Sequence, residues 1–146
     1  MVTTFFVTLL LVTIVAHIHF QALFRLSDFM KSHPHRSRIN LMICTFAVLI
    51  AHVIEVWVFG IGYYFLTKYS EYGRFEGLMT EPTFQDCGYF SFVVYTTLGF
   101  GDLIPHGPIR FLTGMEGLTG LLLITWTASF MYLQMQRFWD ADSGDD

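Results

Sequence analysis

Charged residues are scarce in this chain of 146 residues. Asp, Glu, Lys and Arg together make up 14% of the sequence, whereas 53% of the residues are hydrophobic and 18% are aromatic. With a mean hydropathy of +0.50, a chain of this size could not stay in solution as an ordinary globular domain, so the composition indicates a membrane protein. The formal net charge of −4 gives no sign of the basic surface that nucleic-acid binding requires.

Cysteine is rare as well, with Cys44 and Cys87 as its two occurrences. The first lies in a long apolar run and the second in a shorter, semi-apolar segment. Neither has the spacing to other Cys or His residues that is typical of a metal site. We therefore expect no disulfide and no cysteine-based metal centre.

Three apolar runs are long enough to cross a bilayer, which takes roughly 20 apolar residues in a helix. The first run has no Lys or Arg before it, so we interpret it as a transmembrane helix and not as a cleaved secretory signal. A semi-apolar segment between the second and third runs is too short to cross and is expected to be re-entrant. The sequence thus predicts an all-α integral membrane protein with these segments: an extra transmembrane helix over 1–24, a basic loop over 25–38, an outer helix over 39–67, a re-entrant helix over 84–96, an inner helix over 108–135 and an acidic tail over 136–146.

The loop between the first two runs is the most basic stretch of the sequence. It contains Arg25, Lys31, Arg36 and Arg38 against a single acidic residue, Asp28. Loops rich in Lys and Arg remain on the cytoplasmic side of a membrane. We therefore expect a multi-pass protein of the cell membrane with its amino terminus outside and its carboxyl terminus in the cytoplasm.

The re-entrant segment has the sequence pattern of a helix start. Pro82 and Thr83 precede Asp86, which predicts a capping box in which Asp replaces the usual Glu or Gln. We expect a helix of about three turns that enters from outside and directs its carboxyl end to the membrane centre. The partial negative charge at that end favours a cation.

Two glycines separated by one residue, Gly99 and Gly101, follow this segment. A potassium ion that sheds its water must be met by other oxygen atoms, and a ring of backbone carbonyls supplies them without placing a full charge there. In an ordinary strand successive carbonyls alternate in direction, so residues that adopt positive φ are needed at intervals to turn them to one side. The two glycines meet this need, and Thr97 just before them adds a hydroxyl oxygen. Because one chain supplies one such strand, several chains must surround the pore.

The residues Thr96-Thr97-Leu98-Gly99-Phe100-Gly101-Asp102 closely resemble the threonine, threonine, valine, glycine, tyrosine, glycine, aspartate signature of the potassium channel pore-loop family. The resemblance extends over residues 39–135, which correspond to the pore domain of two-transmembrane bacterial channels. It implies a homotetramer among membrane lipids that conducts K⁺ passively, and we expect neither enzyme activity nor a cofactor. It also implies the ion sites: the carbonyls of Thr97, Leu98, Gly99 and Phe100 and the hydroxyl of Thr97 bind K⁺, Gly101 belongs to the same selectivity filter, and Asp102 lies at the outer mouth.

Three departures from the signature leave alternatives open. Leu98 replaces the usual valine, and Phe100 replaces tyrosine, although it can still pack outward against the pore helix. Val93 stands where some members of the family have a buried glutamate paired with the filter aspartate. A nonselective cation channel and a non-conducting regulatory subunit of the same fold are therefore the alternatives to a potassium channel.

Two residues of the third run are candidates for gating. Glu116 is either a gating or proton-sensing carboxylate behind the pore helix, or a hydrogen-bonded structural acid whose neighbouring glycines permit close helix packing. Gly120 resembles in position the glycine at which inner helices of this family bend on opening. Close packing against the pore helix is the equal alternative.

The histidines raise a competing function. His52 and Glu55 share one helix face and lie at about the depth of Glu116, so a cluster of these three residues would make conduction pH-dependent. By helix rise, His17 and His19 lie nearer the cytoplasmic side, and we do not expect a metal or haem site that joins them to His52. A membrane enzyme or redox protein built on these histidines would bind a metal or haem and would have no use for the filter strand.

Overall fold

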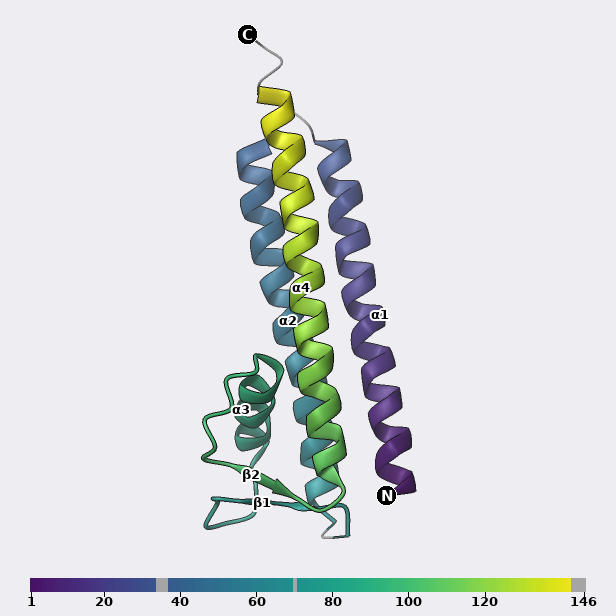
Figure 1. Cartoon of the computed structure of the whole chain (residues 1–146), viewed down its shortest axis with the longest axis vertical. Helices are drawn as coiled ribbons and strands as arrows, with labels where there is room; N and C mark the ends of the chain where they lie inside the picture. The colour runs from purple at the N-terminus through teal and green to yellow at the C-terminus, as the bar shows by residue number, and fades with distance from the viewer. Residues whose placement is uncertain (34–36, 70, 143–146) are drawn as a thin grey trace.

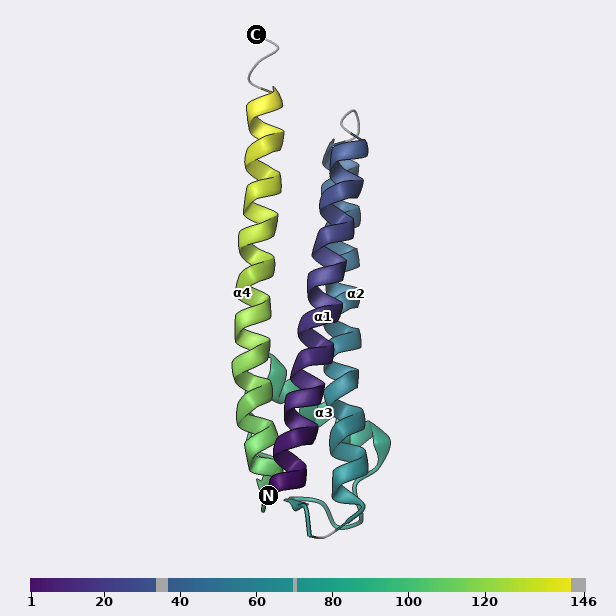
Figure 2. The same cartoon turned by 90° about the vertical axis from the view of Figure 1, so that its right-hand side faces the viewer.

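Three long helices run side by side along the molecule, and a shorter helix lies beside them near one end (Figure 1). The long helices are α1 (Val2–Ser32), α2 (Ser37–Thr67) and α4 (Ile109–Asp142), and the short one is α3 (Phe84–Tyr95). This computed structural model describes residues 1–33, 37–69 and 71–142. Helix α1 packs against both α2 and α4 (Figure 2), and α3 packs against α2 and α4. The all-α fold class predicted from the sequence is confirmed.

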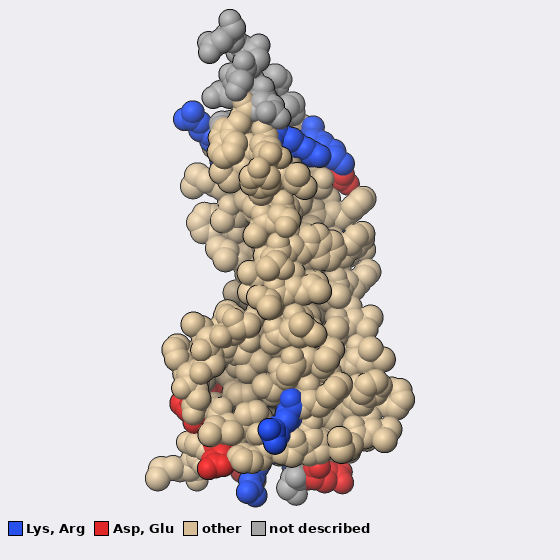
Figure 3. Space-filling model, in the orientation of Figure 1, with Lys and Arg blue, Asp and Glu red and all other residues tan. Residues whose placement is uncertain are grey.

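Each of the three long helices is long and apolar enough to cross a membrane. Charged side chains gather toward the two ends of the molecule on the face shown in Figure 3, and an uncharged band lies between them. The amino end of α1 and the segment between α2 and α4 lie at one end, whereas the α1–α2 connection and the carboxyl end of α4 lie at the other (Figure 1). The chain is therefore a multi-pass membrane protein.

Two helices continue beyond the apolar runs that predicted them. Helix α1 does not end at residue 24 but continues through Ser32, and α4 continues past residue 135 to Asp142. Charged residues end a membrane span but are compatible with a helix in water, so each helix continues beyond its last apolar residues. Most of the predicted basic loop is therefore helical. Its residues 34–36, and residues 143–146 of the predicted acidic tail, lie outside the described residues.

The capping box at the start of α3 is confirmed. The Thr83 hydroxyl oxygen accepts a hydrogen bond from the Asp86 N–H at 3.2 Å, and Asp86 Oδ2 accepts one from the Thr83 N–H at 2.8 Å. The hydrogen bonds from Thr83 hold the pKa of Asp86 below its usual value. The box determines where the chain turns into α3, which ends at Tyr95, one residue earlier than predicted.

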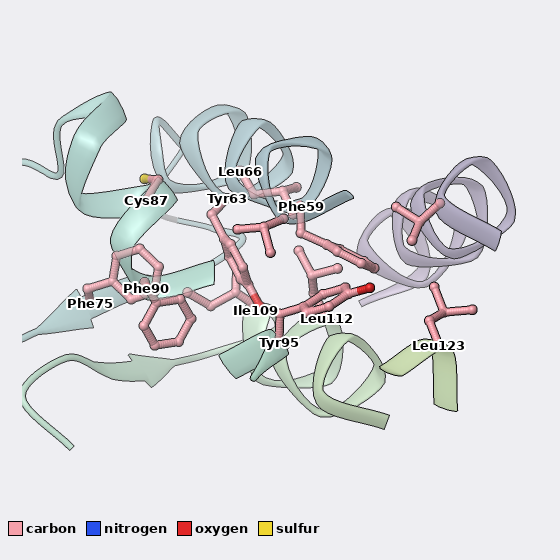
Figure 4. Packing of buried hydrophobic residues seen from close by; sticks show 12 residues of the cluster. Phe59, Tyr63, Leu66, Phe75, Cys87, Phe90, Tyr95, Ile109, Leu112 and Leu123 are labelled. Carbon is pink, nitrogen blue, oxygen red and sulfur yellow. The ribbon is translucent and has the colours of Figure 1, made fainter. Parts of the chain in front are cut away.

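The hydrophobic core fills the space between α2, α3 and the first turns of α4 (Figure 4). Small residues bring α2 and α3 together, because a Cβ on Gly60 would lie 3.2 Å from the Gly88 Cα, and a Cβ on Gly88 would lie 2.6 Å from the Trp57 ring. Helix α3 is thus held inside the fold. The buried aromatic residues of this core are Phe59, Tyr63, Phe75, Phe90 and Tyr95.

A two-stranded antiparallel sheet, which the sequence did not predict, joins the segments on either side of α3. Strand β1 (Arg74–Glu76) pairs with β2 (Ile104–His106), with Phe75 opposite Pro105. Strands of three residues are too short to show an alternating pattern in the sequence. The sheet brings the end of the glycine-containing segment back to the chain that leaves α2.

Candidate functional site

The segment that follows α3 has a backbone in which every second residue has a positive φ. This angle is 60° at Thr97, 58° at Gly99 and 79° at Gly101, whereas Leu98 and Phe100 between them do not have a positive φ. The positive φ at both glycines agrees with the sequence prediction. At Thr97, a β-branched residue, positive φ is a strained conformation that the surrounding structure must hold. A backbone in which the sign of φ alternates from residue to residue can direct successive carbonyls to one side, which an ordinary strand cannot.

Hydrogen bonds anchor the start of this segment to the end of α3. The Val93 carbonyl oxygen accepts the N–H of Leu98 at 3.0 Å and the N–H of Gly99 at 3.3 Å. Among the hydrogen bonds formed by the described residues, none is accepted by the carbonyl oxygens of residues 97–100. These oxygens are therefore free to meet a cation.

The apolar side chains of the segment are largely exposed in a single chain. Leu98 is 62% exposed and Phe100 is 65% exposed in one chain, so the packing of Phe100 against a pore helix stays a prediction. A Cβ placed on Gly99 or Gly101 would meet no atom within 4 Å. Exposed apolar side chains also occur along the membrane-spanning helices of this chain, but Leu98 and Phe100 lie on irregular backbone, which at membrane depth needs cover from protein or water. Burying them requires another molecule.

The end of the segment that is farther from α3 along the chain is held by Asp102. Its carboxylate accepts a hydrogen bond from the Tyr89 hydroxyl at 2.7 Å, and this bond raises the pKa of Tyr89. Sequence reasoning missed Tyr89, whose signal is its place four residues before Val93 on the same short helix. A Cβ on Gly77 would lie 2.1 Å from the Asp102 carbonyl oxygen, so the sheet also approaches this end closely. One helix, α3, thus holds both ends of the segment.

Glu116 is fully buried on α4 and lies behind α3. Its carboxylate accepts hydrogen bonds from the Ser91 hydroxyl and, at 2.6 Å, from the Tyr63 hydroxyl. The hypothesis that Glu116 joins His52 and Glu55 is wrong, because its hydrogen-bond partners lie elsewhere: Tyr63 is two turns from Glu55 along α2. The reading of Glu116 as a hydrogen-bonded structural acid agrees with this geometry.

Gly120 packs directly against the last residue of α3. A Cβ at this position would lie 2.2 Å from the Tyr95 carbonyl oxygen. Gly117, one turn earlier, leaves more room, because its Cβ would lie 3.7 Å from the Val94 carbonyl oxygen. The close-packing alternative for Gly120 therefore agrees with the structure, and its role as a bend stays a prediction.

A second buried polar cluster surrounds Glu55 at the carboxyl end of α3. One carboxylate oxygen lies 3.0 Å from His19 Nδ1, and the other lies 3.1 Å from His52 Nδ1 and 2.5 Å from the Tyr95 hydroxyl. Thr127 of α4 completes the cluster, with its hydroxyl oxygen 3.1 Å from His52 Nε2. Sequence reasoning missed Tyr95 and Thr127. The pairing of His52 and Glu55 on one helix face is confirmed.

The expectation that His19 lies too far from His52 to share a site is wrong. His19 is 13 residues before the end of α1 at Ser32, and His52 is 15 residues after the start of α2 at Ser37. Both therefore lie roughly 20 Å from the connection between the two helices. The sequence estimate measured depth from the ends of the two apolar runs. The first run ends well before the end of α1, whereas the second begins close to the start of α2. His17 is exposed and lies outside the cluster.

A family model described as ion channel matches residues 39–137 of the chain. The chain belongs to this ion channel family. This agrees with the resemblance of the sequence motif to the pore loop of potassium channels. The match spans nearly all of α2, all of α3, the glycine-containing segment and nearly all of α4. No curated protein and no solved structure matches the chain.

Helix α1 lies outside the matched region of this ion channel. It nevertheless reaches the interior of the matched region, because His19 is one of its buried residues and is hydrogen-bonded to Glu55. The other buried side chains of α1 are Thr4, Thr8, Val15 and Leu23. Together with His19 they form one face, at spacings of four or seven residues, toward α2 and α4.

Proposed function

We propose that the chain is one subunit of a potassium-selective channel in which four copies surround a central pore and K⁺ passes without covalent chemistry. The alternation of φ along residues 97–101 carries this proposal. It fits a row of carbonyls from Thr97 to Phe100 that replace the water around a bare ion, with the Thr97 hydroxyl at the inner end. The permeant K⁺ is the ligand that this function needs.

Assembly into a tetramer is supported by what one chain leaves uncovered. Irregular backbone is tolerated at membrane depth where protein buries it or water lines it. In one chain the side chains of Leu98 and Phe100 are largely exposed, and neighbouring subunits would cover them. Four copies would direct their free carbonyl oxygens toward a common axis.

The direction of α3 supports a cation as the permeating species. Its capped amino end lies near the end of the molecule that holds the sheet, and its carboxyl end lies deeper along the bundle (Figure 1). The partial negative charge at a helix carboxyl end attracts cations. We propose that the sheet end faces the outside, with the basic α1–α2 connection and the carboxyl terminus in the cytoplasm.

The test is uptake of rubidium-86 by liposomes that contain the purified full chain and are loaded with potassium chloride. Uptake that external K⁺ competes with, that Na⁺ does not, and that Ba²⁺ blocks is the expected result. Equal competition by Na⁺ would favour the nonselective cation channel. No uptake by a correctly assembled protein would favour the non-conducting regulatory subunit.

A matched pair of variants links this flux to the backbone of the filter. Gly99→Ala forces a side chain into positive φ, which costs roughly 1–2 kcal/mol per residue, although a Cβ there meets no atom within 4 Å of the chain. Gly114→Ala is the control, because its Cβ also meets no atom but the residue lies inside a helix. Selective flux should be lost in the first variant and kept in the second.

A further inference from the structure

The side chains of His19, His52 and Glu55 have the donor set of a transition-metal site. Nδ1 of each imidazole lies against the same carboxylate, at 3.0 Å and 3.1 Å from its two oxygens. One ligand atom from each of the three residues lies within 4.8 Å of the other two. Neighbouring ligands of a tetrahedral zinc ion are about 3.3 Å apart, so small side-chain movements would close this group around an ion. We propose that these residues bind a divalent transition-metal ion of the Zn²⁺ type.

Thr127 occupies the position of an outer partner that orients both imidazoles. Its hydroxyl oxygen lies 3.1 Å from His52 Nε2 and 3.4 Å from His19 Nε2. A histidine that binds metal through one ring nitrogen donates the N–H of the other to an oxygen atom. With the metal on both Nδ1 atoms, both Nε2–H groups donate to Thr127, whose hydroxyl oxygen has two lone pairs. One residue of α4 thus positions ligands from α1 and α2.

The burial of the cluster favours a bound cation. The side chain of His19 is 1% exposed and that of Glu55 is 0% exposed, and a cation bound here would offset the cost of burying the Glu55 carboxylate within a membrane. The Tyr95 oxygen, 2.9 Å from His52 Nδ1, is the fourth ligand candidate.

A cavity gives access to the cluster from one side. Its volume is about 450 Å³, and His52, Tyr95 and Thr127 belong to its lining, which is otherwise mostly apolar. Such a setting excludes bulk water from the ligands and strengthens their attraction to the ion. The inference replaces our expectation that the chain needs no cofactor, and it assigns a role to α1: His19 would tie this helix to the end of α3.

The test is metal binding by the purified, tag-free full chain. After treatment with a chelator, the protein is equilibrated with Zn²⁺ and, separately, with Co²⁺, whose visible absorption reports tetrahedral coordination. We expect one ion per chain for the wild type and for His17→Ala, whose target lies two residues from His19 but is exposed. His19→Ala should lose stoichiometric binding. Thr127→Val keeps all ligands and should weaken binding roughly 10–100-fold.

Size-exclusion elution of each variant as the wild-type oligomer is the control for folding. Wild-type protein that elutes normally and takes up neither ion would overturn the proposal, and so would full binding by His19→Ala, which would place the ion elsewhere. Equal affinity of Thr127→Val and the wild type would also contradict the arrangement described. Metal content is measured without ion flux, so the result is independent of whether the pore selects potassium.

Discussion

Gly120 is the position at which a single methyl group best tests how α4 holds the pore. In Gly120→Ala the new Cβ would lie 2.2 Å from the carbonyl oxygen of Tyr95 and 3.0 Å from its carbonyl carbon. Ordinary contact needs a separation of about 3.4 Å, so α4 and the end of α3 must move apart by about 1 Å. The clashing atoms belong to the backbone and cannot rotate away. Because Tyr95 lies two residues before Thr97, the shift would reach the proposed filter at residues 97–102.

The expected magnitude follows from two opposing terms. Overpacking of this kind costs about 1–3 kcal/mol, and replacing a helical glycine by alanine returns about 0.5–1 kcal/mol. The free energy of unfolding of Gly120→Ala should therefore fall by about 1–2 kcal/mol. Gly117→Ala is the matched control, because its Cβ would lie 3.7 Å from the Val94 carbonyl oxygen, an ordinary contact. That variant should keep the helical gain and be slightly more stable than the wild type.

Thermal unfolding of the purified oligomer and rubidium uptake with sodium as competitor measure the two consequences. We expect Gly120→Ala to unfold at a lower temperature than Gly117→Ala and to discriminate less against Na⁺. A bend at Gly120 makes the opposite prediction: stability and selectivity stay unchanged, and the open probability changes. A Gly120→Ala protein that is as stable and as selective as Gly117→Ala would refute the packing argument.

Three further predictions concern the contacts that hold α3. Ser91→Ala removes one donor to the buried Glu116 carboxylate and should lower the free energy of unfolding by about 1–3 kcal/mol, measured by thermal or denaturant unfolding. Thr83→Ala should cost about 1 kcal/mol through loss of the cap. The bonds from Thr83 lower the pKa of Asp86, so their stabilisation should be present above the ordinary carboxyl pKa of about 4 and fade as pH falls through the lowered value. A loss of stability in Thr83→Ala that persists undiminished in strong acid would contradict this. Tyr89→Phe should leave the fold intact but reduce discrimination against Na⁺ in the flux assay, because the Asp102 end of the proposed filter loses its bond to α3. Unchanged selectivity would show that this bond is dispensable.

The features that could be predicted from the sequence depend on neighbouring residues. A transmembrane helix needs only a sufficient length of apolar side chains, and all three runs became helices long enough to cross. The cap at Thr83 needs its partner three residues away, and the positive φ of Gly99 and Gly101 is a property of glycine itself. The motif at residues 96–102 likewise predicted the family, which the match over residues 39–137 shows.

Which buried groups meet was decided by the tertiary structure. Whether two side chains meet depends on the height and rotation of their helices, so a misjudged helix end displaces a distant residue by several ångströms. That error separated His19 from His52 in the sequence estimate, whereas Glu116 meets Ser91 and Tyr63 and not His52 and Glu55. The short helix α3 separates the two buried acids, because Ser91 and Tyr95 lie one turn apart on its buried face. Ser91 is hydrogen-bonded to Glu116, and Tyr95 is hydrogen-bonded to Glu55.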